Sequence, residues 1–336
     1  MKAIQFLGMT AFMAAMLTGC SNDSELAHSN FPDDNIIRVT AGVNGAVTRA
    51  ETMGTELNSK FSLTVVNKDT ENEYNYKYTH ENKIFQKIDK EWICNTILLW
   101  QDAETKVDVA ALAPVTNDDM KFFGILDNKN QFQTLEYDIT ADQKTQKPEN
   151  DLLYYYQSDL VPRTALNSDG KLDIQFNHAF SMIDIIVTLG TEYSNKENPI
   201  NKVIVGGSKL KATVDVANSE GYGVAYPSES GNNPETDITT IPVTFNKATT
   251  DQENSTAISS CILIPQTIDA NKFKVTLKTS SKTYVWTSPS AITLKSGHKY
   301  TLELKMGKDK LTAQKGNISA GSWTKGTGSG STLGTK

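Results

Sequence analysis

The sequence predicts an all-β protein built from β-sandwich domains, and three observations support this class. Apolar and polar residues alternate along many short segments, as in strands that bury one face. Helical periodicity is scarce, and the short segments are separated by clusters of Asn, Asp, Gly and Lys, which favour turns. The chain of 336 residues is long enough for two ordinary domains. We therefore expect two β-sandwiches in tandem.

Residues 1–19 have the pattern of an export signal. Lys2 is the only charge before an apolar run that is too short to span a bilayer stably. The run ends in Leu-Thr-Gly-Cys, residues 17–20, which resembles a bacterial lipobox with cleavage before Cys20 and lipid on its thiol. A plain secretory signal followed by an incidental cysteine is the alternative. No later stretch has the ~18 apolar residues that a spanning helix needs.

Two acidic residues, Asp23 and Glu25, follow the lipidation candidate. They resemble the surface-export signal of Bacteroidetes lipoproteins; the alternative is retention facing the periplasm. We expect an outer-membrane lipoprotein, attached through the lipid on Cys20. The formal charge is −6, from 33 basic and 39 acidic residues. The chain therefore lacks the excess of Lys and Arg that binds a phosphate backbone, and a nucleic-acid partner is disfavoured.

Strand-like segments occur in two series. The first series occupies residues 36–43, 61–66, 74–78, 92–100, 107–111 and 152–156. The second occupies residues 172–176, 180–187, 203–205, 214–216, 258–264, 273–277, 284–286 and 300–304. Pro162 and the run Asn-Ser-Asp-Gly at residues 167–170 lie between the two series. We therefore expect a leader at residues 20–49, one domain at 50–165 and a second at 166–336.

Recognisable catalytic and metal-binding patterns are lacking. The four histidines stand far apart, and there is no His-Glu-x-x-His, Cys-x-x-Cys, nucleophile elbow or phosphate-binding glycine loop. The acidic pairs at 33–34 and 118–119 are typical of solvated turns, since a calcium site needs more oxygens at regular spacing. Carboxylates are plentiful, so a pair of catalytic carboxylates of the glycosidase type remains an alternative, although no sequence feature identifies two particular residues. We expect no enzyme activity, no metal and no cofactor.

The remaining cysteines and the aromatic residues each allow two interpretations. Cys94 and Cys261 lie in strand-like runs of different expected domains, which favours two buried thiols over a disulfide. Aromatic residues could form a sugar-stacking platform, but they more often fill cores and interfaces. The aromatic residues concerned are Trp92, Trp100, Trp286, Trp323, Tyr74, Tyr76, Tyr78, Tyr154, Tyr155 and Tyr156.

Several short motifs, taken in order, resemble the fimbrillin family, the subunits of type V pili in Bacteroidetes. After the lipobox and the strand at 36–43 come Val-Thr-Arg-Ala at 47–50 and Val-Asp-Val-Ala-Ala-Leu-Ala-Pro at 107–114. Phe-Asn-His-Ala-Phe-Ser follows at 176–181, then Leu-Lys-Ser-Gly-His-Lys-Tyr-Thr at 294–301 and Ile-Ser-Ala-Gly-Ser-Trp at 318–323. The resemblance implies two transthyretin-like β-sandwich domains and a role in a surface fibre.

The resemblance also implies a maturation step. In this family an arginine-specific protease cuts in a loop after the first strand, and the matching bond here joins Arg49 to Ala50. Arg38 is a second basic candidate, but it lies inside the strand and should be shielded. An ordinary solvent-facing arginine is the alternative interpretation of Arg49.

Strand exchange is the mechanism that this cleavage would serve. The first strand has an apolar face made of Ile37, Val39, Ala41 and Val43. Burying each Ile or Val of this face stabilises the fold by about 1.5–3 kcal/mol. Losing that strand after cleavage would leave a groove with unpaired edges for a strand of another pilus subunit. The family's donor is the C-terminal segment, here residues 311–336, with three candidate residues that fill the groove: Ile318, Ala320 and Trp323.

The donor pattern is weaker than the strand that it would replace. Its alternating residues carry little apolar bulk, and alternation places Trp323 on the opposite face from Ile318 and Ala320. We therefore expect a structural subunit of a cell-surface pilus, with its place as stalk, tip or anchor left open. A glycan-binding surface lipoprotein with tandem sandwiches is the competing hypothesis.

Overall fold

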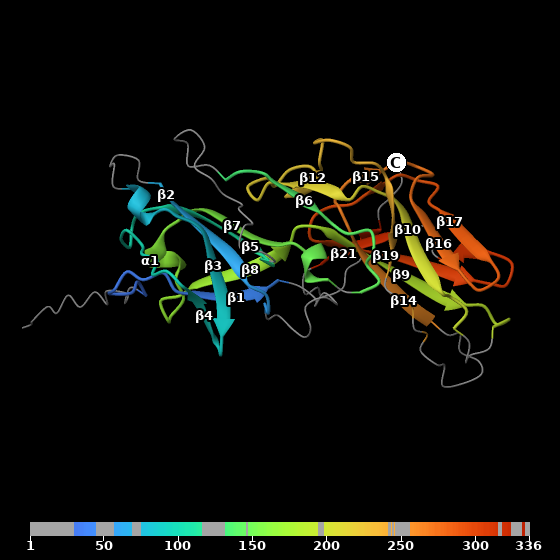
Figure 1. Ribbon diagram of the computed structural model, residues 1–336, viewed down its shortest axis with the longest axis horizontal. Helices are drawn as coiled ribbons and strands as arrows, with labels where there is room; N and C mark the ends of the chain where they lie inside the picture. The colour runs from blue at the N-terminus through green and yellow to red at the C-terminus, as the bar shows by residue number, and fades with distance from the viewer. Residues whose placement is uncertain are drawn as a thin grey trace, which may run out of the picture.

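The computed structural model describes residues 30–44, 57–68, 75–115, 132–145, 147–193, 198–240, 243, 245, 256–314, 318–323 and 331–332. These residues form an elongated molecule with two β-rich lobes (Figure 1). Among them the helical elements are α1 (Pro162–Ala165) and two 3-10 turns, Asn75–Tyr78 and Pro148–Asn150. The predicted all-β sandwich class is confirmed. The segment at 74–78, expected as a strand, instead contains the first of the 3-10 turns.

The first lobe is built on one seven-stranded sheet. In spatial order its strands are β1 (Val39–Val43), β8 (Leu172–His178), β7 (Leu153–Leu160), β5 (Val107–Ala113), β2 (Phe61–Asn67), β3 (His80–Ile88) and β4 (Glu91–Cys94). Alternate residues of β2, namely Phe61, Leu63 and Val65, point into the first core and are at most 1% exposed. Phe61 packs edge-on against Phe176 of β8, with ring centroids 5.5 Å apart. These contacts join strands from opposite ends of the lobe's sequence.

The second lobe combines four smaller sheets. The four-stranded sheet has β13 (Thr236–Thr239), β10 (Lys202–Ser208), β16 (Lys274–Lys278) and β17 (Thr283–Thr287). The six-stranded sheet has β14 (Thr256–Leu263), β9 (Ser181–Leu189), β19 (His298–Met306), β20 (Leu311–Ala313), β21 (Ser319–Ser322) and β22 (Ser331–Thr332). A three-stranded sheet has β12 (Ala225–Pro227), β11 (Lys211–Val214) and β6 (Leu135–Asp138), and β15 (Thr267–Ile268) pairs with β18 (Ile292–Thr293).

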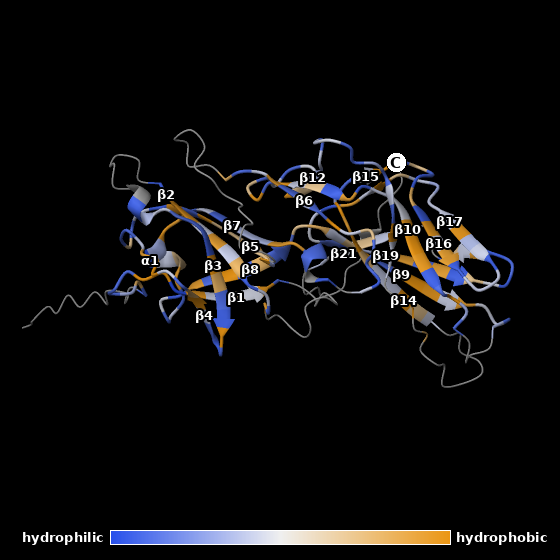
Figure 2. Ribbon diagram, viewed as in Figure 1, coloured by the Kyte–Doolittle hydropathy of each residue, from blue (hydrophilic) through white to orange (hydrophobic). Residues whose placement is uncertain are grey.

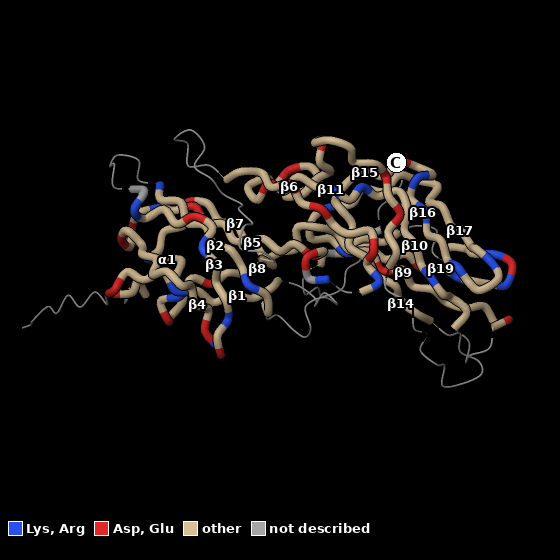
Figure 3. The backbone as a smooth tube through the Cα atoms, in the orientation of Figure 1, with Lys and Arg blue, Asp and Glu red and all other residues tan. Residues whose placement is uncertain are grey.

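The second core lies between these sheets. β9 is an interior strand of its sheet, because it pairs with β14 on one side and runs parallel to β19 on the other. Its Ile183, Ile185 and Val187 are fully buried. Figure 2 shows apolar residues concentrated on the strands and polar residues in the connections. Basic and acidic residues are interspersed over both lobes in Figure 3.

The chain passes from the first core to the second at the end of β8. The expected division between residues 165 and 166 falls inside the seven-stranded sheet, because β8 follows it and still pairs with β1 and β7. Pro162 and residues 167–170, which suggested a division, form α1 and a turn. In this turn Gly170, at φ +70°, donates its N–H to the Asn167 carbonyl. Conversely, β6 lies before the expected division but pairs with β11 of the second lobe.

Candidate functional site

The leader segment, residues 35–44, is packed into the first lobe. Ile37 is 4% exposed and Val39 is 2% exposed, and both belong to the first core. Ala41 and Val43 are half-buried against the same core. The four residues singled out by alternation therefore lie on one face and contact one cluster.

The leader segment joins the two ends of the sheet. Its strand β1 runs parallel to β8, from the pair Val39–Leu172 to the pair Val43–Phe176. Just before β1, the Ile37 N–H donates to the Leu98 carbonyl at 2.9 Å, and the Trp100 N–H donates to the Asn35 carbonyl at 2.8 Å. Residues 98–100 follow β4, the opposite end of the sheet. One short segment thus forms backbone hydrogen bonds to β8 on one side and to residues 98–100 on the other.

Strand β8 depends on the leader segment for most of its ladder. β8 pairs with β7 at only two positions, Leu153–His178 and Tyr154–Asn177. β1, by contrast, pairs with five consecutive residues of β8. The Asn44 N–H extends this ladder to the Phe176 carbonyl at 2.7 Å. Without the leader segment, the first five residues of β8 would lose their main strand partner.

Polar contacts at Arg38 hold the first half of the leader segment. The Arg38 guanidinium donates two hydrogen bonds to Asp34, at 2.9 and 2.6 Å, and these lower the pKa of the Asp34 carboxyl to about 2. Both side chains are largely exposed, so the pair adds little stability. The Arg38 carbonyl accepts the Leu172 N–H at 2.8 Å. Because this carbonyl is part of a β-ladder, the bond after Arg38 is shielded from a protease.

His80 supports the stretch that receives the leader segment. Its buried Nε2 lies 3.2 Å from the Leu99 nitrogen and 2.9 Å from the Leu99 oxygen. Leu99 is itself bridged to Ile36 of the leader segment. Burial, with a smaller contribution from Lys83, lowers the pKa of His80 below its usual value of 6.5. The folded state therefore favours the neutral imidazole.

Acidification from pH 7.5 to 5.5 is expected to destabilise the first lobe through His80. The unfolded chain takes up a proton below about 6.5, whereas the folded chain resists it, so the His80 contribution is full above that pH and decreases as the pH falls below it. Denaturant unfolding at both pH values should show a smaller pH-dependent loss in His80→Gln than in the unchanged chain. Equal losses in the two proteins would contradict this role.

The described part of the C-terminal segment, residues 311–314, 318–323 and 331–332, is docked on the chain's own second lobe. β21 pairs antiparallel with β19, from the pair His298–Ser322 to the pair Thr301–Ser319. The predicted donor residues are all buried in the second core: Ile318 is 6%, Ala320 8% and Trp323 1% exposed. To act as a donor, these residues would have to leave their own sheet.

Trp323 lies beside a buried acid–histidine pair at the junction of the two cores. Its ring stacks on His178, with centroids 3.8 Å apart and planes inclined by 10°. His178 Nδ1 is 2.9 Å from Asp151 Oδ1, and both side chains are 2% exposed. Asp151 directly precedes Leu152, whose carbonyl accepts the Ala179 N–H.

Three of the sequence motifs meet at this junction. The Gly297 N–H donates to the Phe180 carbonyl at 3.0 Å, and the Trp323 N–H donates to the Gly297 carbonyl at 2.8 Å. Phe180, Gly297 and Trp323 come from the segments 176–181, 294–301 and 318–323, which alternation alone left unrelated. The order of these motifs along the chain thus corresponds to one contact region.

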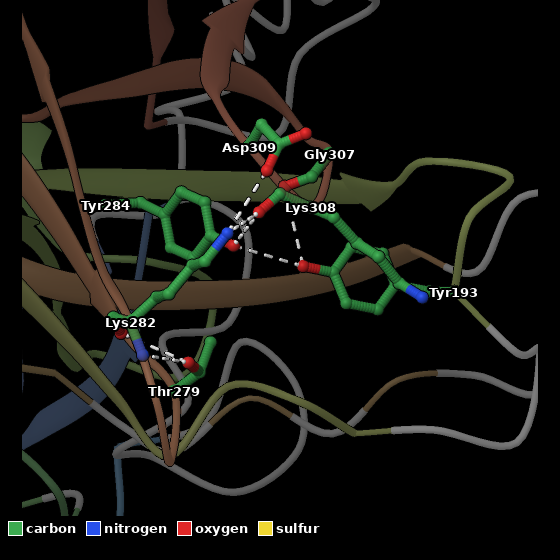
Figure 4. A network of polar contacts seen from close by, with 7 residues as sticks. All are labelled: Tyr193, Thr279, Lys282, Tyr284, Gly307, Lys308 and Asp309. Atoms are coloured by element: carbon green, nitrogen blue, oxygen red, sulfur yellow. Dashed lines mark hydrogen bonds and ion pairs between the residues drawn. The ribbon is translucent and has the colours of Figure 1, made fainter.

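A polar network at the far end of the second lobe fixes the start of the C-terminal segment (Figure 4). Tyr284 donates to the Lys308 carbonyl at 2.7 Å, and Lys282 Nζ donates to the same oxygen at 2.8 Å. Lys282 also pairs with Asp309 at 3.1 Å, while the Tyr193 hydroxyl lies 3.4 Å from that of Tyr284. The β16–β17 hairpin therefore holds the turn that leads into β20.

A protein-family model described as fimbrillin-like matches residues 48–323. The chain belongs to the fimbrillin-like family. Membership of this family supports a pilus or adhesin subunit of a cell-surface fimbrium that assembles with other pilus subunits, and it indicates a structural rather than an enzymatic role.

Solved structures share the fold of this fimbrillin-like chain. A fimbrial protein from Bacteroides vulgatus is 15% identical with a TM-score of 0.55, covering 86% of this chain and 99% of that one. A candidate cell adhesion protein from Bacteroides ovatus is 18% identical with a TM-score of 0.57, covering 84% and 96%. Another from Bacteroides uniformis is 15% identical with a TM-score of 0.53, covering 87% and 100%. No curated protein matches the chain.

Other predicted sites of the fimbrillin-like chain have different outcomes. Cys20, Arg49 and Ala50 lie outside the described residues. Cys94 and Cys261 are both free thiols; Cys261 is buried, which raises its thiol pKa, whereas Cys94 is only half-buried. In the part of the chain that the structure describes, no group of His, Cys, Asp and Glu could hold a metal ion, and no helix has the length and apolarity to cross a membrane.

The tryptophans do not form an exposed platform. Trp100 and Trp323 are each 1% exposed, and Trp92 and Trp286 pack half-buried against the first and second cores. A different pair of aromatic residues, not predicted from the sequence, lines an open cleft of the second lobe: Tyr222 and Tyr226. Their signal was weak because both stand in a segment rich in Gly, Ser and Asn, without alternation.

Proposed function

We propose that this fimbrillin-like chain is a structural subunit of a type V pilus and assembles by strand exchange. In this proposal it is exported as an outer-membrane lipoprotein with lipid on Cys20. An arginine-specific protease then cuts between Arg49 and Ala50, and the subunit enters the surface fimbrium. The leader segment leaves, and a strand from another pilus subunit occupies its place.

The position of the leader segment is the observation that supports the proposal. It supplies one apolar face to the first core and forms backbone hydrogen bonds to β8 and to residues 98–100. A cut after residue 44 and before residue 57 would leave it attached by non-covalent contacts alone. Its departure would expose apolar surface and leave unpaired backbone groups on β8 and on residues 98–100, which a donated strand can satisfy.

The docked C-terminal segment favours a subunit that accepts a strand over one that donates. Donating residues 318–323 would remove Ile318, Ala320 and Trp323 from the second core. Exposing each large apolar side chain costs about 1.5–3 kcal/mol of stability. The strand that it leaves, β19, would also lose an edge partner. We therefore place the chain at the tip of a fibre rather than in its stalk.

Limited trypsin treatment of the purified, signal-free chain tests the proposal. We expect one early cut at Arg49, read as a new amino terminus at Ala50 by mass spectrometry. After the leader segment has dissociated, the cut chain should form mixed oligomers with a subunit that carries a free donor strand, as seen by size-exclusion chromatography. Arg49→Lys, which trypsin still cuts, is the matched control for Arg49→Ala. Equal oligomer formation by Arg49→Ala would rule out the cleavage step.

A further inference from the structure

An open cleft of approximately 710 Å³ lies on the second lobe beside β12. Its walls come from β12, from the loops before and after it, and from Lys209, which directly follows β10. The volume is in the range of ~300–1,000 Å³ typical of small-ligand sites. From the residues that line this cleft, we infer that it binds a neutral saccharide.

The loops that form the cleft are held in place by two asparagines. Asn218 donates to the Gly223 carbonyl at 3.2 Å and accepts the Glu220 N–H at 2.9 Å. Asn233 accepts the Lys211 N–H at 3.1 Å and donates to the Lys211 carbonyl at 2.8 Å. Both amides are engaged with the backbone, so they shape the cleft. A site whose loops are fixed in advance loses less entropy on binding.

Two half-buried tyrosines supply the aromatic surface. Tyr222 donates its hydroxyl to Thr267 at 3.2 Å, which restrains its ring. Tyr226 lies on β12, opposite Thr213 of β11. Burial and nearby carboxylates, among them Glu229, raise the pKa of Tyr226, so its hydroxyl stays a donor at neutral pH. Aromatic rings offer an apolar face to the C–H side of a sugar ring, and tyrosine adds a polar tip.

The charged side chains of the cleft decide the class of ligand. Lys209, Glu220 and Glu229 line it, and their side chains form no hydrogen bond or ion pair with any other described residue. They offer both donors and acceptors, and each sugar hydroxyl can do both. An anionic ligand would be repelled by two carboxylates, and a cationic one would meet the Lys209 ammonium. A neutral ligand with several hydroxyls fits best.

The cleft is separate from the groove that holds the leader segment. β12 lies on the second lobe and β1 on the first (Figure 1). Saccharide binding therefore goes beyond strand exchange and requires neither cleavage nor assembly.

Binding of the uncut monomer to immobilised oligosaccharides tests the inference. The panel holds neutral glycans containing galactose, mannose, glucose and N-acetylated sugars, beside sialylated and sulfated ones. We expect binding to at least one neutral glycan, weakened at least tenfold by Tyr226→Ala and by Glu229→Gln. Tyr155→Ala, a half-buried tyrosine on the first lobe, is the matched control and should bind normally.

Three results would overturn the inference: no binding to any neutral glycan, preference for charged glycans, or neutral binding that neither cleft variant weakens. Thermal unfolding of each variant separates lost binding from lost folding. Glu229 is exposed, so Glu229→Gln keeps the test valid if Tyr226→Ala fails to fold. Because the uncut monomer is used, a failure here is independent of any failure in polymerisation.

Discussion

Replacing Trp323 with alanine is expected to lower the free energy of unfolding by about 3–5 kcal/mol, the usual cost of deleting a buried aromatic side chain. Trp323 is 1% exposed in the second core and stacks on His178, so its removal leaves a cavity at the junction of the two cores. Denaturant unfolding followed by circular dichroism measures the loss. The variant should also expose residues 318–323 to hydrogen exchange, because Trp323 is the largest side chain that holds them.

Two variants control for this effect. Trp286→Ala removes a half-buried tryptophan from the same lobe and should lower the free energy of unfolding by a clearly smaller amount. Trp323→Phe should also cost less than Trp323→Ala, since it keeps an aromatic ring over His178 and removes an indole N–H that has no hydrogen-bond partner among the described residues. A loss in Trp323→Ala no greater than in Trp286→Ala would show that the C-terminal segment is only loosely docked.

The local pattern of the strands was readable from the sequence, but their partners were not. Alternation at Ile37, Val39, Ala41 and Val43 predicted a strand with one buried face; the strand observed is Val39–Val43, and Ile37 just before it packs into the same core. Nothing in alternation specifies that this strand runs parallel to β8, whose residues lie more than 130 positions further along the chain. The pattern fixes which face is buried and leaves the neighbouring strand open. Alternation likewise does not specify that β8, after residue 165, pairs with β7, or that β6, before it, pairs with β11.

The C-terminal segment shows the limit of alternation most clearly. A period of two placed Trp323 on the opposite face from Ala320, but β21 ends at Ser322 and the chain then turns Trp323 into the same core. The alternation at residues 318–322 is equally suited to the chain's own sheet and to a neighbour's groove. The cleft was missed because most of its residues stand in loops, and those loops come together through β12 and its pairing with β11.

Replacing Ile37 with aspartate is expected to detach the leader segment without any cleavage. The change loses about 1.5–3 kcal/mol of apolar burial and places an unpaired carboxylate in the first core, which costs more. The bond after Arg38 is then freed from the β-ladder. In an Arg49→Ala background, we expect trypsin to cut at Arg38 about a hundredfold faster or more, since about 3 kcal/mol corresponds to that factor. A time course by mass spectrometry measures it.

Ile36→Asp is the matched control, with the same substitution one residue earlier. Ile36 is half-exposed and lies outside the first core, so its change should leave Arg38 largely resistant. Resistance in both variants would mean that the apolar face does not retain the leader segment. Fast cutting in Ile37→Asp alone would show that the apolar face holds the segment in its groove. A protease acting after Arg49 would then need only to separate the segment from the chain, and exchange with a donor strand could follow.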